Sequence, residues 1–408
     1  MRLSGPGRGL RRLDARPALL APLSFGLSGT AFVVANLLLA RVLPVEQYAL
    51  MALLVSVVNV SMVAAPLGID GVVARGSAAV SRRLLGRVLL AAVVVALAAA
   101  IYLRLTAGVG PLIAGLLIVC VSAAAITLVV AAQFQAAQAF ARSLFYLRSQ
   151  DFALLFASAA AIAVSARHAL TPFAFLTGAF VAVAIAAWRD GVRRLQPASG
   201  QRSSSWYESI AYLSVQLSGT LSMQLERLLT PSLLTLKDLA ALGVVLALVG
   251  PPFRLLQMTA GYALQPRLRA AESDALRVRL LINEGLLAAA IVLVASVGLW
   301  FVTPLLTHFL LRDKVFVGPS LLLAALVSGA LKVASGFAKA CMTALASDRE
   351  LALAGAIGWI AVAVAVVGAS AGARYGLSGI VYGVAAGWAL RVATAAWMVV
   401  RRLRRKRT

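Results

Sequence analysis

Long apolar runs separated by short polar stretches follow one another along almost the whole chain. Most runs are about 18–25 residues long, the length that an α-helix needs to cross roughly 30 Å of hydrocarbon. Backbone groups in that medium must bond to each other, so each run is a helix or a strand of a closed barrel. The short alternating segments of a barrel are not visible, so the pattern predicts helices.

The runs predict an all-α polytopic membrane protein with about twelve transmembrane helices. The predicted spans are 18–40, 48–69, 84–105, 111–132, 149–166, 171–188, 209–230, 239–263, 280–302, 316–340, 351–371 and 376–400.

Composition agrees with this class. The chain is 62% hydrophobic and only 13% charged, whereas a soluble domain is nearer half apolar and about a quarter charged. The net charge of +24 would suit nucleic-acid binding if the basic residues formed one patch. They instead concentrate in alternate loops, as the positive-inside rule requires. We therefore expect both termini in the cytoplasm, attraction to membrane lipids, and no nucleic-acid partner.

The longest polar stretch follows the sixth predicted span and divides the chain into two sets of six helices. We expect an N-terminal half over 1–190, a cytoplasmic linker over 191–206 and a C-terminal half over 207–408, with six helices in each half.

A weak internal repeat supports the two halves. Leu27-Ser28-Gly29-Thr30 recurs as Leu217-Ser218-Gly219-Thr220. Glu46 and Asp238 open equivalent spans, and Arg75 and Arg267 follow at matching distances. Two repeats of six helices have the same orientation, which implies a pseudo-two-fold axis along the membrane normal and a site between the halves.

Five basic residues fall inside predicted spans, where a lipid-facing charge costs roughly 2.5–3.5 kcal/mol on insertion scales. Arg227 and Arg391 lie toward span ends, from which a long side chain can reach the membrane surface. The other three are Arg254, Lys332 and Lys339.

The span 316–340 and its continuation carry a polar stripe at helical spacing. Its two lysines have no obvious carboxylate partner in the sequence, which favours a water-filled cavity. The alternative is a packed helix interface, helped by Gly329 and Gly336. The stripe consists of Ser328, Lys332, Ser335, Lys339 and Thr343.

The span 209–230 carries a similar face that includes Gln216 and Gln224. In the next span, Pro251-Pro252 directly precedes Arg254. Two prolines remove backbone donors and usually kink a helix, so we expect a hinge beside a buried cation, with simple packing as the alternative.

The interior balance is cationic, because only Asp70 and Glu226 stand out as acids within the membrane. A cationic cavity suits an anionic group such as phosphate or pyrophosphate. We assign Arg254, Lys332 and Lys339 to substrate binding, Gln216 and Gln224 to sugar contacts, and Asp70 and Glu226 to proton or sodium coupling. No nucleophile elbow, phosphate-binding glycine loop or zinc motif is present, so we expect a non-enzyme without metal or cofactor.

Four stretches resemble the Wzx-type oligosaccharide flippases, which are polysaccharide biosynthesis proteins. The run Leu37 to Ala49 (LLLARVLPVEQYA) is similar to the family's LARLLGPEEYG stretch, and Pro66 to Asp70 (PLGID) to its LGLD stretch. Glu226 to Leu229 resembles DRLLLG, and Gln265 to Leu268 resembles LPRLS. The chain departs at Pro44 and Ala49, where the family has glycine, and at Glu226, where it has aspartate.

The resemblance implies a member of the superfamily that also contains multidrug exporters and lipid II flippases, with two six-helix bundles arranged around a central cavity. It implies flipping of an undecaprenyl-pyrophosphate-linked oligosaccharide across the bacterial inner membrane by alternating access, for surface polysaccharide such as O-antigen. It also implies a polysaccharide polymerase and a chain-length regulator as partners. The alternatives are a multidrug or small-molecule exporter of the same fold, and a non-transporting scaffold of a glycan assembly complex.

Overall fold

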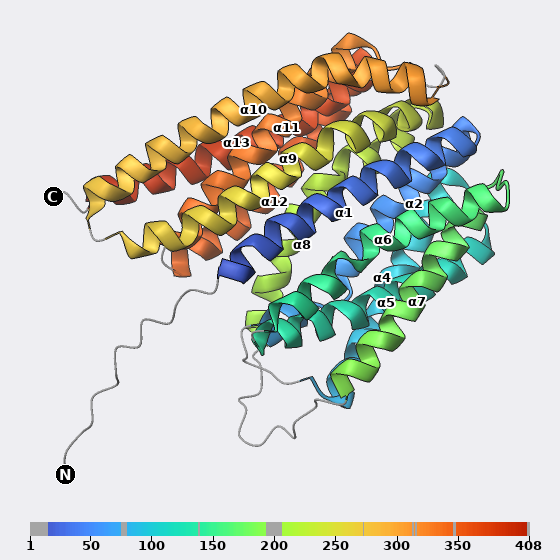
Figure 1. The fold of residues 1–408 in the computed structure, drawn as a ribbon, viewed down its shortest axis with the longest axis horizontal. Helices are drawn as coiled ribbons and strands as arrows, with labels where there is room; N and C mark the ends of the chain where they lie inside the picture. Colours follow the sequence, from blue (N-terminus) through green and yellow to red (C-terminus); the bar gives the residue numbers. More distant parts are fainter. Residues whose placement is uncertain are drawn as a thin grey trace.

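The protein is described by a computed structural model over residues 15–74, 80–137, 139–192, 206–271, 273–311, 314, 316–345 and 348–405. These residues form long α-helices and a few short turns, and no strand occurs among them (Figure 1). The expected all-α fold with twelve long helices is therefore confirmed. The elements are α1 Ala15–Val42, α2 Val45–Ala64, the short α3 Ile69–Ala74, α4 Arg82–Ala107, α5 Pro111–Ala136, α6 Phe140–Ala163, α7 Leu170–Val192, α8 Trp206–Leu233, α9 Leu236–Ala270, α10 Asp274–Leu311, α11 Pro319–Leu345, α12 Asp348–Gly372, the 3₁₀ turn η1 Ala373–Tyr375 and α13 Gly376–Arg405.

Each predicted span overlaps one long helix, although several helices extend beyond their spans; α10, for example, runs from Asp274 to Leu311 where 280–302 was predicted. Two of the differences have a clear local cause. The span 48–69 ends early, at Ala64, because Pro66 lacks an N–H and Gly68 adopts φ 76° in the turn to α3. The span 149–166 belongs to a helix that already begins at Phe140. Arg142 and Arg148 interrupt the apolar pattern there and hid the first turns of α6.

Among the described residues, nine segments are long and apolar enough to cross a membrane by length and composition. One of them, Leu353–Arg401, runs through both α12 and α13. The long helices α6 and α8 are not among these segments, because they carry charged and amide side chains. Both helices line the cavity described below, where such side chains are shielded from lipid.

Helix contacts repeat between the two halves. Within the first half α1 packs on α6, α5 on α7 and α6 on α7; within the second, α8 packs on α12, α11 on α13 and α12 on α13. The contacts between the halves are also matched, since α1 packs on α9 as α2 packs on α8. This is the pattern that a pseudo-two-fold relation between α1 and α8, and between α2 and α9, would produce.

The repeated Leu-Ser-Gly-Thr motif has the same local structure in both copies. Ser28 and Ser218 are both buried, and each hydroxyl donates to the carbonyl three residues earlier, at 3.2 Å. Of the other proposed matches, Glu46 and Asp238 lie in the first turns of α2 and α9. Arg75 and the side chain of Arg267 lie outside the described residues.

One end of the bundle is closed by apolar packing between the halves. The close approach of α2 and α9 is visible at Gly243, where an added Cβ would lie 3.2 Å from the Tyr48 hydroxyl. We call this cluster the far-end seal, because it lies opposite the end at which α1 begins and α13 ends (Figure 1). Its fully buried side chains are Leu39, Leu43, Tyr48, Leu239 and Leu242.

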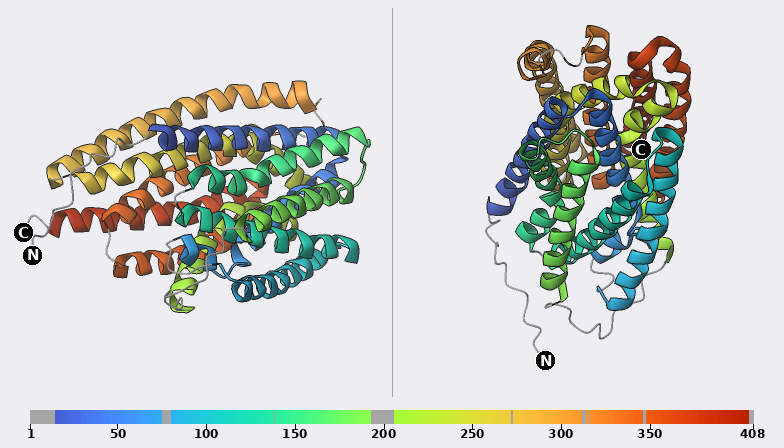
Figure 2. Two further views of the ribbon diagram at one scale, coloured as in Figure 1. Left: turned by 60° about the horizontal axis from the view of Figure 1, so that its bottom comes forward. Right: turned by 90° about the vertical axis from the view of Figure 1, so that its right-hand side faces the viewer.

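The outer surface is apolar, as a bilayer requires. Helix α10 lies along one edge of the bundle in all views, with the N-terminal half on the opposite side (Figures 1 and 2). None of its most apolar stretch is buried, and Leu293, Val294 and Phe309 are among the most exposed side chains of the protein.

Glycines bring α12 and α13 into backbone contact. A Cβ on Gly383 would lie 2.2 Å from the carbonyl carbon of Gly368, and a Cβ on Gly372 would lie 2.1 Å from the carbonyl oxygen of Gly379. Such spacing of small residues allows close helix packing in membranes, where apolar burial contributes little to association. The hairpin therefore depends on the absence of side chains at these positions.

Replacing Gly383 by alanine should destabilise the protein by about 1–3 kcal/mol, because rigid backbone atoms occupy the space of the new methyl group. Thermal unfolding of the purified protein in detergent, followed by circular dichroism, measures this effect. The matched control is Gly298→Ala on α10, where nothing lies within 4 Å of the added atom. That control should be neutral or slightly stabilising; an equal loss in both variants would show that close packing is not the cause.

Candidate functional site

A cavity lies between the two halves, at the level where α1, α2, α6, α7, α8 and α9 converge. It contains about 470 Å³ of space free of protein atoms, part of it open to solvent. Its apolar wall is formed by Phe32, Val55, Val58, Leu154, Leu176 and Phe180. Its polar residues are Asn59, Gln150, Asp151, Gln224 and Arg254.

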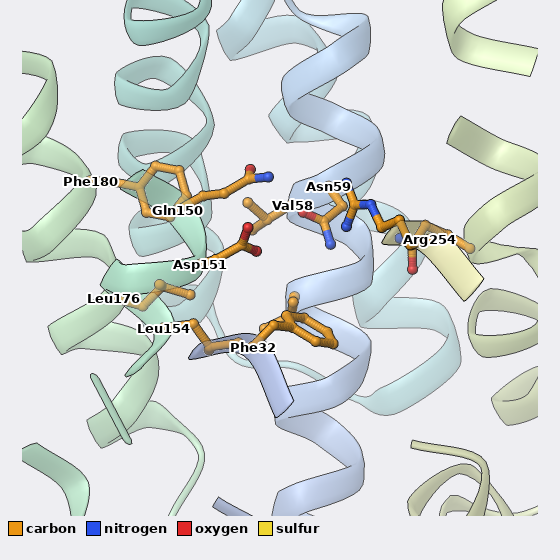
Figure 3. Close-up of a pocket in the computed structure, with 11 residues that line it drawn as sticks. Phe32, Val58, Asn59, Gln150, Asp151, Leu154, Leu176, Phe180 and Arg254 are labelled. Atoms are coloured by element: carbon orange, nitrogen blue, oxygen red, sulfur yellow. The ribbon is translucent and has the colours of Figure 1, made fainter. Parts of the chain in front are cut away.

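The polar residues come from both halves and face one another. Gln150 and Asp151 of α6 project from one side, and Asn59 of α2 and Arg254 of α9 project from the other (Figure 3). Three amides, one carboxylate and one guanidinium can therefore reach the same bound molecule. Amides both donate and accept hydrogen bonds, which suits hydroxyl-rich ligands, whereas the guanidinium suits phosphate or carboxylate.

Asp151 is a functional candidate that the sequence analysis missed. It lies in the middle of α6, with 6% of its surface exposed. Arg148 approaches it to 4.0 Å and stacks its own guanidinium on the Phe25 ring, 3.9 Å from the centroid. The predicted span began at residue 149, so Asp151 seemed to belong to a membrane boundary. The polar run from Arg148 to Asp151 was the available signal.

Of the three cations predicted to bind substrate, Arg254 alone lines this cavity. Its side chain is exposed, and its charge acts on Asp151 across the space between the halves. Helix α9 continues through Pro251 and Pro252 without a break in its helical assignment. Pro251 faces Gly29 of α1, where an added Cβ would lie 3.6 Å away. The prolines thus mark a close approach of the halves; their role as a hinge stays a prediction.

Lys332 was expected to lack a carboxylate partner, but the structure shows that it has one. Its ammonium lies 2.9 Å and 3.0 Å from the two carboxylate oxygens of Glu226. The Ser328 hydroxyl donates to the same carboxylate at 2.7 Å. Glu226 is fully buried, so α8 and α11 share an ion pair within the C-terminal half. Sequence alone could not show this contact, because the two residues lie far apart in the chain.

Lys339 lies about two turns further along the same face of α11. Its side chain is exposed, and it is close enough to Arg391 for the two positive charges to repel. Arg391 itself is held inside the C-terminal half. It donates to the carbonyls of Ser218 on α8 and Gly358 on α12, both at 2.9 Å. This cation therefore joins three helices and does not extend to the membrane surface as its position near a span end suggested.

Arg227 is also buried, with 5% of its surface exposed. It reaches from α8 into the N-terminal half, where its guanidinium lies 5.9 Å from the Phe32 ring centroid and within electrostatic range of Tyr48. Glu226 and Arg227 are adjacent in the sequence, but their side chains contact different halves of the protein. Glu226 stabilises the interior of one half, and Arg227 contacts the other half beside the far-end seal.

Asp70 and Gln216 meet at a different place. Gln216 of α8 lies beside the Asp70 carboxylate of α3, and one buried oxygen of Asp70 has no hydrogen-bond partner among the described residues. The turn before α3 fits tightly on α8, since a Cβ on Gly68 would lie 2.0 Å from the Ser209 carbonyl oxygen. Of the two residues predicted to contact sugar, Gln224 lines the cavity and Gln216 does not.

Within the described part of the chain, no cluster of three or more His, Cys, Asp or Glu side chains is placed to hold a metal ion. The two cysteines, Cys120 and Cys341, are free and buried.

Comparison with known proteins identifies the fold. No family model and no curated protein sequence matches the chain. Among solved structures, the inward-facing form of a multidrug resistance MATE family transporter of the MOP superfamily matches with a TM-score of 0.62 and 16% identity, over 95% of this chain and 98% of that chain. The lipid II flippase MurJ, in an inward closed conformation, matches with a TM-score of 0.64 and 10% identity, over 94% and 87%.

A third structure, a ligand complex of the MATE multidrug transporter DinF-BH, matches with a TM-score of 0.61 and 16% identity over 99% of both chains. The chain shares the fold of these transporters. Because the identities are low, the likeness extends to the fold alone, and the substrate must be argued from the residues of this chain.

Replacing Lys332 by methionine should leave Glu226 as an uncompensated buried charge and destabilise the protein by about 3–5 kcal/mol. The double variant Glu226→Gln with Lys332→Met removes both charges and should recover most of that loss. Unfolding in detergent measures the change in the free energy of unfolding for each variant. Lys237→Met, at an exposed lysine, is the control. A double variant as unstable as Lys332→Met alone would show that the ion pair is not the source.

Proposed function

We propose that the protein is a bacterial inner-membrane flippase that moves an undecaprenyl-pyrophosphate-linked oligosaccharide across the bilayer by alternating access. The observation that carries the proposal is the cavity between the halves. It places one exposed guanidinium, Arg254, among the amides of Asn59, Gln150 and Gln224. A pyrophosphate would pair with Arg254, and sugar hydroxyls would bond to the amides.

The shared fold supports transport as the mechanism, since the matched proteins are transporters and a flippase by description. The far-end seal supports alternating access. It closes the cavity on one side, and its residues come from α1, α2 and α9, so it would separate when the halves move. The oligosaccharide would enter from the end at which α1 begins, while the lipid tail stays in the bilayer.

We extend the proposal to coupling by protons or sodium. Glu226 is neutralised by Lys332, and Asp70 lies outside the cavity lining. Asp151 is better placed than either, because it lines the cavity opposite Arg254.

Asp151 also favours a second candidate, the export of organic cations. A buried carboxylate near the rings of Phe32 and Phe180 could hold a flat cation through charge and cation–π contact. Two of the matched structures are described as multidrug transporters. Flipping of a pyrophosphate-linked substrate requires the positive charge of Arg254, whereas export of organic cations requires the negative charge of Asp151. Variants of these two residues can therefore distinguish the candidates.

Substituting Arg254 by alanine should lower the rate of flipping of a fluorescent lipid-linked oligosaccharide in liposomes by about tenfold or more, because a charge-assisted hydrogen bond contributes about 1.5–3 kcal/mol. Arg254→Lys should retain part of the rate. Arg167→Ala, at an exposed residue outside the cavity, should have no effect. In the same assay, run without an ion gradient, Asp151→Asn should leave flipping intact.

The outcome that would favour the exporter is different. In that case the parent protein would not flip the lipid-linked oligosaccharide, and Asp151→Asn would abolish the transport of organic cations.

A cysteine at Asn59 tests alternating access against a static scaffold. The native cysteines are buried, so background labelling is low. Under alternating access, Asn59→Cys reacts with a membrane-impermeant maleimide added from either face, measured in right-side-out and inverted vesicles. Leu53→Cys, at a fully buried site, serves as the unreactive control. Labelling from one face only would contradict transport and favour the scaffold.

A further inference from the structure

A second hollow lies on the outer surface of the N-terminal half, away from the central cavity. It is a groove between α5 and α7 that holds about 640 Å³ of space free of protein atoms, including the part open to the side. Its lining is apolar except at one end, where Arg189 stands. The lining residues are Ala123, Ile126, Val181, Ala184, Ile185, Trp188 and Arg189.

Small and large residues shape the groove. Ala123 and Ala184 are buried and form its floor, because their short side chains leave room above them. Val181 and Trp188 pack against the protein core, so these walls are fixed. Ile185 is 49% exposed and borders the opening. From Val181 to Arg189 the groove extends for roughly 12 Å along the helix at 1.5 Å per residue, most of the depth of one leaflet.

The charge at the end of the groove is not compensated by the neighbouring acid. Asp190 is turned toward α6, where the Tyr146 hydroxyl donates to its carboxylate at 2.8 Å. Arg189 is exposed and has no ion-pair partner among the described residues. It lies in the last turn of α7, at the end of an apolar span, where a lipid headgroup would be found.

We propose that this groove binds one acyl chain of an anionic phospholipid, whose headgroup phosphate pairs with Arg189. The apolar lining fits hydrocarbon, and Trp188 lies at the depth where indole rings favour the membrane interface. The exposed guanidinium supplies selectivity for a negative headgroup. The site is separate from the central cavity, so it does not depend on the transported substrate.

Trp188 provides a direct measurement. Full-length protein is reconstituted into vesicles containing a minor fraction of lipid with brominated acyl chains, which quench nearby indole fluorescence. The signal of Trp188 is the difference between the parent protein and Trp188→Phe. Brominated phosphatidylglycerol should quench this signal at about fivefold lower mole fraction than brominated phosphatidylcholine, as expected for about 1 kcal/mol per basic residue near the surface.

Three variants separate the groove from general charge attraction. The preference is the ratio of the mole fractions of phosphatidylcholine and phosphatidylglycerol that give equal quenching. Arg189→Ala should reduce this ratio to about one, and Arg189→Lys should retain most of it. Ala184→Leu fills the groove and should remove the preference although Arg189 remains. The control is Arg401→Ala, because Arg401 lies 5.2 Å from the exposed Trp397 ring on α13, outside the groove. This control should leave the Trp188 preference unchanged.

Equal quenching by the two lipids in the parent protein would overturn the proposal. A preference that persists in Ala184→Leu would also overturn it, since the headgroup would then be attracted without an acyl chain in the groove. Circular dichroism of each variant confirms that the comparison is made between folded proteins.

Discussion

A charge placed in hydrocarbon must find its partner inside the protein, and this constraint orders the helices of the bundle. Glu226 pairs with Lys332, Arg391 donates to two backbone carbonyls, and the Arg227 guanidinium lies 5.9 Å from the centroid of the Phe32 ring. Each contact joins α8 to another helix, so the most polar helices lie inside. The apolar α10 can then lie at the edge with its side chains in lipid. Hydroxyl groups follow the same rule locally, since Ser56 and Thr127 bond to carbonyls four residues earlier.

The sequence predicted the helices well because their length and polarity are local properties. The short α3 and the early start of α6 were missed, since Pro66 and Arg142 alter the pattern at those ends. Contacts between distant helices could not be predicted. Lys332 was assigned to a cavity, although Glu226 compensates it within the same half. Asp151 was overlooked, although it lies at mid-helix in the cavity. Arg254 and Gln224 line the cavity between the halves, and their assignment to substrate and sugar stays a prediction.

Packing density differs along the interface between the halves. At the far-end seal, large apolar side chains and Gly243 leave no space. About three helical turns further along α2 and α9, polar residues face a hollow. The Tyr48 hydroxyl in this seal is buried and has no hydrogen-bond partner among the described residues. Opening the seal would therefore break no hydrogen bond of that hydroxyl and would expose it to water, whereas separating a polar network leaves buried groups unpaired. Under the proposed mechanism, the seal is therefore the part of the interface that opens.

The two halves repeat their helix contacts but not their charges. Asp151 belongs to the first half and Arg254 to the second, so a movement of the halves that widens the cavity between these residues would draw opposite charges apart. That separation costs energy unless another anion takes the place of the carboxylate near Arg254. A bound pyrophosphate would do so, and protonation of Asp151 would reduce the cost in the same way. Under the proposed mechanism, pseudo-symmetric packing with asymmetric charge would couple the opening of the bundle to what the cavity contains.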